Sequence, residues 1–167
     1  YYAMKANYNL HILQALKNCG ARIDTVSPAE VLLCLKLGFN KEDILYTANN
    51  LTDEEVDFIF NQGVLLNIDS LSRLEKFASK YPNSKVCLRI NTNVLAGENA
   101  HVQTAGDRTK FGILLNDLDK IKKIIQEYNI KVVGLHKHTG SGIADSNKFY
   151  ESMNNLLNIA TKENFPD

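Results

Sequence analysis

The segment Arg22-Ile23-Asp24-Thr25-Val26-Ser27-Pro28-Ala29-Glu30 predicts a β-strand that passes directly into an α-helix. Its opening half contains isoleucine, threonine and valine, the β-branched residues that strands favour. The serine has the position of a helix N-cap, the proline that of the first helical residue and the glutamate that of the third. Apolar residues continue at helical spacing to Gly38, a residue type that commonly ends helices. The segment therefore opens one strand-then-helix unit.

The same alternation of strand and helix continues on both sides of this segment. Predicted strands cover residues 1–7, 22–26, 44–48, 65–68, 86–91 and 131–136. Predicted helices cover residues 10–19, 28–38, 52–62, 70–80, 116–128 and 146–163. A longer polar connection, residues 92–110, interrupts the rhythm. Such units in succession, joined by short loops, predict a parallel sheet with helical crossovers.

Two α/β architectures contain units of this kind. A doubly wound sheet usually begins with a G-x-G-x-x-G turn, which this sequence lacks. A (β/α)8 barrel takes eight units, so the units counted here would form three quarters of one. We therefore predict the fold class α/β, as an incomplete (β/α)8 TIM barrel of about six βα units. No linker or low-complexity segment divides the chain, so one partial barrel domain is expected over residues 1–167.

Composition excludes several classes of partner. The 167-residue chain has 44% hydrophobic residues, and its 19 basic residues balance its 19 acidic residues, so no nucleic-acid partner is expected. No apolar run approaches the roughly 20 residues of a membrane span, so no membrane partner is expected. Cys19, Cys34 and Cys87 are scattered and odd in number, which predicts buried thiols in a reducing compartment and favours the cytoplasm. The chain begins in mid-strand without a methionine, and we expect it to be a fragment of a longer protein.

Lys5 follows an aromatic and apolar run at the end of the opening strand. Burying an unpaired ammonium is costly and drives the amine towards its neutral form. A neutral lysine amine is a nucleophile that forms a Schiff base with a carbonyl compound. The alternative interpretation is a solvated lysine at a fraying strand end.

The other predicted strands also end in polar residues, and in a barrel the carboxyl ends of the strands carry the site. The segment His138-Thr139-Gly140-Ser141-Gly142 is typical of a phosphate cradle, because its glycines let backbone N–H groups approach an anion and its serine adds a hydroxyl donor. An ordinary glycine-rich turn is the alternative. His136 and His138 are two residues apart along a strand, and no other His or Cys lies at ligand spacing to them, so we predict no metal site.

A lysine nucleophile, a phosphate cradle and an imidazole at one barrel rim together indicate pyridoxal 5'-phosphate as cofactor. Arg89 would pair with a carboxylate or with the phosphate. Asp24 and Glu30 would hold the lysine and water in place, although Glu30 is equally well explained as a capping residue. Helix capping explains the remaining polar strand ends equally well, namely Asn49-Asn50 and Asp69-Ser70.

Four ordered motifs resemble those of the fold-type III pyridoxal phosphate decarboxylases, and the resemblance covers essentially the whole chain. The motifs are Tyr2-Ala3-Met4-Lys5-Ala6-Asn7, Asp24-Thr25-Val26-Ser27-Pro28-Ala29-Glu30, Lys110-Phe111-Gly112-Ile113 and Gly134-Leu135-His136-Lys137-His138-Thr139-Gly140-Ser141. The resemblance implies a carbon–carbon lyase that decarboxylates an amino acid with pyridoxal phosphate. It also implies a barrel followed by a β-rich domain, and a homodimer whose subunits share each active site.

The resemblance implies a role for each candidate residue. Lys5 would bind the aldehyde of the cofactor, and His138 would stack on its pyridine ring. The phosphate would be bound by Gly140, Ser141 and Gly142, while Asp24, Glu30 and Arg89 would support the cofactor and the lysine. Lys110 would lie near the dimer interface or the mouth of the site. In the preceding loop, Ala105 and Asn99 replace a usual glycine and a frequent histidine of the family.

Within the family, the resemblance favours decarboxylation of meso-2,6-diaminopimelate to L-lysine, in lysine biosynthesis. Ornithine, arginine and carboxynorspermidine are alternative substrates, and a racemase of similar barrel is a further alternative. A non-catalytic pyridoxal phosphate carrier and a barrel remnant without cofactor are the alternatives outside catalysis. The fragment without the last strands and the β-rich domain is expected to be inactive.

Overall fold

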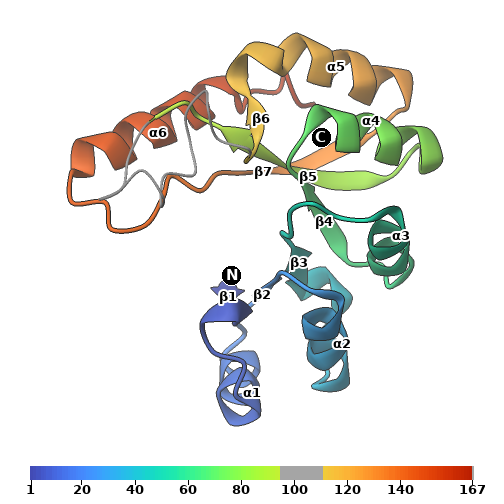
Figure 1. Ribbon diagram of the computed structural model, residues 1–167, viewed down its shortest axis with the longest axis vertical. Helices are drawn as coiled ribbons and strands as arrows, with labels where there is room; N and C mark the ends of the chain where they lie inside the picture. Colours follow the sequence, from blue (N-terminus) through green and yellow to red (C-terminus); the bar gives the residue numbers. More distant parts are fainter. Residues whose placement is uncertain (95–110, 167) are drawn as a thin grey trace. The chain divides into compact units, whose positions relative to one another are not determined.

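A computed structural model describes residues 1–94 and 111–166 of the chain (Figure 1). The chain forms two compact units, Tyr1–Asn67 and Ile68–Asp167. Strands and helices mostly alternate along the sequence, as the sequence predicts, although the second unit has one short extra strand. Three residues that the motifs single out, Asn99, Ala105 and Lys110, lie outside the described residues.

The first unit is a parallel sheet whose strands pair in chain order, β1 with β2, β2 with β3 and β3 with β4. Its strands are β1 (Tyr2–Ala3), β2 (Ile23–Thr25), β3 (Ile44–Tyr46) and β4 (Leu65–Ile68). Its helices are α1 (Leu10–Asn18), α2 (Pro28–Lys36) and α3 (Asp53–Asn61), with the 3-10 helices η1 (Met4–Ala6) and η2 (Lys41–Asp43). All neighbouring strands are parallel because a helical crossover returns the chain to the same edge each time.

The core of the first unit lies between its sheet and its helices. Ile23 of β2 and Ile44 of β3 lie opposite each other in register, and both are buried. The helices contribute Leu13, Val31 and Ile59, which are each 0% exposed. Because each helix buries an apolar stripe while its other face is polar, packing against the sheet stabilises it.

The helix start predicted at Ser27 is confirmed. The Ser27 side chain accepts a hydrogen bond from the Glu30 N–H at 3.2 Å, and Pro28 occupies the first turn of α2. The Glu30 carboxylate accepts a hydrogen bond from the Val26 N–H at 2.7 Å. Two backbone donors that the helix cannot satisfy are thus paired locally.

The opening strand is shorter than predicted. The sequence predicts a buried strand over residues 1–7, but β1 has two half-buried residues and the chain then turns into η1. The turn is closed by the Asn7 N–H, which donates to the Met4 carbonyl at 3.1 Å. Met4 is the buried residue of η1, and it contacts the Cys34 Sγ of α2 at 3.5 Å. One apolar side chain therefore anchors the turn, and the residues after it face solvent.

The second unit is a parallel sheet with β5 at its centre. Its strands are β5 (Lys85–Asn91), β6 (Ile113–Leu114) and β7 (Lys131–His136). Its helices are α4 (Leu71–Lys80), η4 (Leu115–Asp117), α5 (Leu118–Glu127) and α6 (Ser146–Ile159). β5 pairs with β7 along its length and with β6 at its carboxyl end. β6 was not predicted, because two residues show no periodicity.

Gly112 permits the pairing of β6 with β5. Its φ is +81°, and a Cβ at this position would lie 2.8 Å from the backbone nitrogen of Asn91 and 3.2 Å from the carbonyl oxygen of Arg89. A backbone neighbour cannot move aside as a side chain can. The glycine of the Lys-Phe-Gly-Ile motif is therefore required by a close approach of two backbone segments.

Two other sequence expectations need correction. Cys34 and Cys87 are buried as predicted, but Cys19 is exposed, because it follows α1 and precedes the turn at Gly20. The last helix was predicted to reach residue 163, but α6 ends at Ile159. The Asn164 side chain donates a hydrogen bond to the Ile159 carbonyl at 3.0 Å and so satisfies the helix end. Among the described residues, no helix is long and apolar enough to span a bilayer.

Candidate functional site

Lys5 lies in η1, directly after β1, and its side chain is exposed. Of the two interpretations that the sequence leaves open for Lys5, the structure shows the solvated lysine at a strand end. The strand ends at Ala3 and the 3-10 turn begins at Met4. Met4 is therefore the buried residue of this turn, and Lys5 is exposed to solvent. What remains is a primary amine at the carboxyl end of a strand, accessible to a reactant.

Asp24 also lies at this edge of the first unit, opposite Ala3 in the register of β1 and β2. Its carboxylate is half-buried and accepts a hydrogen bond of 2.6 Å from the hydroxyl of Thr47, which follows β3. A short bond to a buried hydroxyl fixes the direction of this carboxylate. Sequence reasoning missed Thr47, although a threonine directly after a buried strand is the kind of polar strand end by which the other candidates were found.

Glu30 fixes the turn before α2 in this structure. Its carboxylate accepts the hydrogen bond from the N–H of Val26, the residue before the N-cap, and not from the N–H of Ser27 as in the predicted capping box. Its negative charge also acts on neighbouring groups of the first unit. The pKa of Tyr46 is raised to about 12, first by burial and then by the charges of Glu55 and Glu30.

Arg89 is a buried cation of the second unit, with 7% of its surface exposed. Its guanidinium carbon lies 4.9 Å from the centre of the Phe111 ring, a cation–π distance. Burial raises the pKa of the Asp69 carboxyl, and the charge of Arg89 opposes that shift. Arg89 is thus held next to an aromatic face and within the field of an acid. Phe111 gives a structural reason for the aromatic residue in the Lys-Phe-Gly-Ile motif.

The segment after β7 carries the predicted imidazole and glycines. β7 ends at His136, so His138 lies in a loop and the expectation that both histidines lie on one strand is wrong. His138 is exposed, whereas His136 is half-buried opposite Arg89 in the register of β5 and β7. Gly140 and Gly142 have φ values of 133° and 67°, and the exposed Ser141 lies between them. Left-handed backbone on both sides of a serine exposes main-chain N–H groups, which suits an anion.

A serine of α6, which sequence reasoning missed, lies beneath this segment. Ser152 is fully buried, and its hydroxyl contacts the side chains of Lys137 and Thr139 on either side of His138. A single serine inside an amphipathic helix gives no signal in the sequence, because its partners are distant along the chain.

Helix capping accounts for some of the remaining polar strand ends. Ser70 caps α4 by accepting a hydrogen bond from the Arg73 N–H at 3.4 Å. Asn49 and Asn50 do not cap α3, whose N-cap is Thr52, and Asn50 instead adopts a positive φ of 54°. In the described part of the chain, no three His, Cys, Asp or Glu side chains gather as metal ligands would.

The candidate residues fall into two groups, one in each unit. Lys5 and Asp24 belong to the first unit, together with Glu30, which fixes the turn before α2. The second unit holds Arg89, His138, Gly140, Ser141 and Gly142. The exposed amine of the first unit suits an aldehyde, and the second unit offers an exposed imidazole and a hydroxyl between glycines of positive φ, which suits an anion.

Comparison with known proteins gives one matching family model, described as "Pyridoxal-dependent decarboxylase, pyridoxal binding domain", over residues 1–164. The diaminopimelate decarboxylase of Methanothermobacter thermautotrophicus is 37% identical over 161 residues, which are 96% of this chain and 38% of that relative. The chain therefore spans about two fifths of the length of this curated relative.

Solved structures of the same class have a similar fold. The diaminopimelate decarboxylase of Helicobacter pylori, complexed with L-lysine, matches with a TM-score of 0.82 and 26% identity, over 95% of this chain and 42% of that one. The arginine decarboxylase of Paramecium bursaria Chlorella virus matches with a TM-score of 0.76 and 26% identity, over 96% of this chain and 45% of that one. The predicted α/β class, with the parallel sheet and helices of the N-terminal barrel domain of such decarboxylases, is confirmed.

Proposed function

Because the chain belongs to the pyridoxal-dependent decarboxylase family through its pyridoxal-binding domain, we propose that the full-length protein decarboxylates an amino acid with pyridoxal 5'-phosphate. The single observation that carries this proposal is the exposed amine of Lys5, directly after β1, in a chain that matches this domain model over residues 1–164. An accessible primary amine at a strand end is the group that an aldehyde cofactor requires.

Each candidate residue takes a role that suits its environment. Lys5 would bind the aldehyde, and the imidazole of His138 would lie against the pyridine ring. Ser141 and the backbone N–H groups at Gly140 and Gly142 would hold the phosphate. When bound, the cofactor supplies the electron sink for loss of the α-carboxylate.

The acidic and basic residues orient these groups. Asp24, fixed by Thr47, places a negative charge at the strand edge where Lys5 lies. Arg89, packed on Phe111, provides a buried positive charge for an anionic partner. Glu30 supports the site indirectly by fixing the turn between β2 and α2.

We propose diaminopimelate as the substrate and lysine as the product. The proposal is supported by the curated relative and by the Helicobacter structure, both of which are diaminopimelate decarboxylases. The similar arginine decarboxylase supports a second candidate, a decarboxylase of another basic amino acid. We also propose that the full-length protein is a homodimer whose subunits share each site, and that it works in the cytoplasm, where its free thiols remain reduced.

The role of Lys5 is tested by borohydride reduction of the full-length protein loaded with pyridoxal phosphate. Reduction fixes the cofactor on the amine that binds it, and peptide mass spectrometry locates the modified residue. We expect the modification on Lys5, and we expect Lys5→Ala to abolish the visible absorption band of the bound cofactor. Lys36→Ala, which removes another exposed lysine from α2, is the matched control and should keep the band. Modification of a different lysine, or a normal band in Lys5→Ala, would show that the proposal is wrong.

A further inference from the structure

The hydroxyl of Ser152 joins segments from three parts of the second unit. Ser152 lies in α6 and is 0% exposed. Its Oγ lies 2.6 Å from Oγ1 of Thr92, which directly follows β5, and 3.0 Å from Oγ1 of Thr139, which follows β7. The ammonium of Lys137 donates to the same Oγ at 3.2 Å. One buried oxygen thus contacts the carboxyl ends of two paired strands.

These contacts use the full hydrogen-bonding capacity of the serine. A hydroxyl has one proton to donate and two lone pairs that accept. Lys137 can only donate, so it takes one lone pair of Ser152, and the two threonines take the proton and the other lone pair. Removing the hydroxyl would leave three buried or half-buried partners without this contact.

Lys137 is held on both sides. Its ammonium also donates to the Thr139 hydroxyl at 2.8 Å, and it lies 4.2 Å from the centre of the Phe149 ring, one turn before Ser152 on α6. Burial lowers the pKa of this amine. Lys137 and Thr139 are therefore both fixed to α6, and they are the two neighbours of His138.

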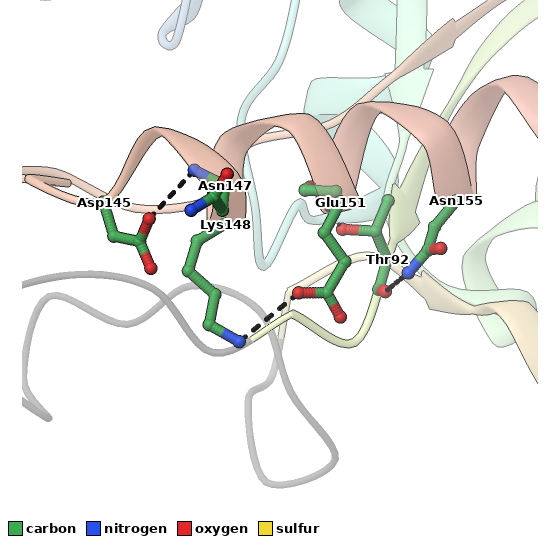
Figure 2. A network of polar contacts seen from close by, with 7 residues as sticks. Thr92, Asp145, Asn147, Lys148, Glu151 and Asn155 are labelled. Carbon is green, nitrogen blue, oxygen red and sulfur yellow. Dashed lines mark hydrogen bonds and ion pairs between the residues drawn. The ribbon is translucent and has the colours of Figure 1, made fainter.

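A second contact fixes α6 to the end of β5. Asn155, one turn after Ser152, donates through its side-chain amide to the Thr92 carbonyl at 3.1 Å (Figure 2). Residues three apart lie on the same face of a helix, so this face of α6 holds both the hydroxyl and the carbonyl of Thr92. Figure 2 also shows the start of α6 closed by Asp145, which accepts a hydrogen bond from the Asn147 N–H at 2.9 Å. Contacts that do not involve Ser152 therefore also hold α6 in place.

We propose that Ser152 and Thr139 are positioning residues for His138. Because the side chains on either side of His138 are held by α6, the backbone at His138 is fixed from both directions. Lys137 is half-buried and Thr139 is 4% exposed, whereas His138 between them is exposed. The imidazole is thereby presented to solvent on a fixed stretch of backbone. The proposal rests on the function proposed above, in which that imidazole lies against the cofactor ring.

The test measures the affinity of the full-length apoprotein for pyridoxal phosphate, together with the visible circular dichroism of the bound cofactor. Thr139→Val keeps the volume of the side chain and removes its hydroxyl, and Ser152→Ala removes the central hydroxyl. Each should weaken cofactor binding about fivefold, the effect of one net hydrogen bond, and reduce the dichroism. Thr139→Ser restores the hydroxyl and should bind within about twofold of the wild type. Glu151→Gln changes an exposed residue of the same helix and is the matched control.

A double-mutant cycle separates positioning from general destabilisation. If Thr139 acts through His138, then Thr139→Val should not weaken binding further in the His138→Ala protein. Equal losses in both backgrounds would overturn the positioning role. If His138→Ala itself leaves affinity and dichroism unchanged, the imidazole does not contact the cofactor and both proposals for His138 fail. If His138→Ala weakens binding while Thr139→Val and Ser152→Ala do not, the positioning role alone is wrong.

Discussion

At the scale of single residues, one motif glycine and two hydroxyls outside the motifs have structural roles that the sequence alone does not reveal. Gly112 is required by a backbone approach, and Ser152 and Thr47 are required by buried hydrogen bonds. Composition and spacing identified the charged residues and the histidines at strand ends. They did not identify the hydroxyls that hold them, because those contacts connect positions 23 and 60 residues apart in the sequence.

The first stability prediction concerns Gly112→Ala, with Gly20→Ala as its matched control. Both glycines have a φ near that of left-handed helix, +81° and +75°. A Cβ at Gly20 would meet nothing within 4 Å, so only the backbone penalty of about 1 kcal/mol applies. At Gly112 the Cβ also meets the backbone of β5, so we expect a loss of about 2–4 kcal/mol.

Urea denaturation of both variants measures these free energies of unfolding. A loss at Gly112 no larger than that at Gly20 would contradict the close approach of the segment before β6 to β5. The comparison isolates that approach because the backbone strain is common to both positions.

At the scale of helices and strands, the sequence predicted best where capping residues and apolar periodicity agree. The start of α2 follows directly from Ser27 and Pro28, and β4 has the predicted bounds, Leu65–Ile68. β1 was predicted too long, because the sequence does not show that a 3-10 turn at Met4 competes with an extended strand. Because of this turn, the amine of Lys5 is exposed in the structure and not buried at the end of a longer strand.

A second stability prediction concerns the start of α3. The Thr52 hydroxyl accepts a hydrogen bond from the Glu55 N–H at 3.2 Å, and the Glu55 carboxylate accepts one from the Thr52 N–H at 3.0 Å. Thr52→Ala removes the first of these bonds and should lower the free energy of unfolding by about 1 kcal/mol. Thr52→Ser keeps the hydroxyl and should stay within a few tenths of the wild-type value. Thermal denaturation followed by circular dichroism compares the two, and equal stability of both variants would show that the bond to the Thr52 hydroxyl contributes nothing.

At the scale of the whole molecule, the regular alternation of strand and helix was sufficient to predict a parallel α/β fold. The similarity to solved decarboxylases confirms that class. The approach of Lys5 to His138 across a barrel mouth stays a prediction, because the two residues belong to different compact units. A sequence pattern predicts which residues end the strands, whereas their meeting depends on closure of the complete barrel.

Substrate choice is also a property of the whole protein, and it gives the last prediction. Diaminopimelate carries a second amino and carboxyl group at its far end, whereas ornithine and arginine lack that carboxylate. A site that pairs with a polar group rejects an analogue without it, because its own buried polar groups are then left unpaired. We therefore expect kcat/KM of the full-length protein to favour meso-diaminopimelate over ornithine and arginine by a factor of about 10⁴. Carbon dioxide release measured for the three amino acids in parallel tests this ratio. A preference for ornithine or arginine would leave the decarboxylase proposal intact and replace its substrate with the second candidate.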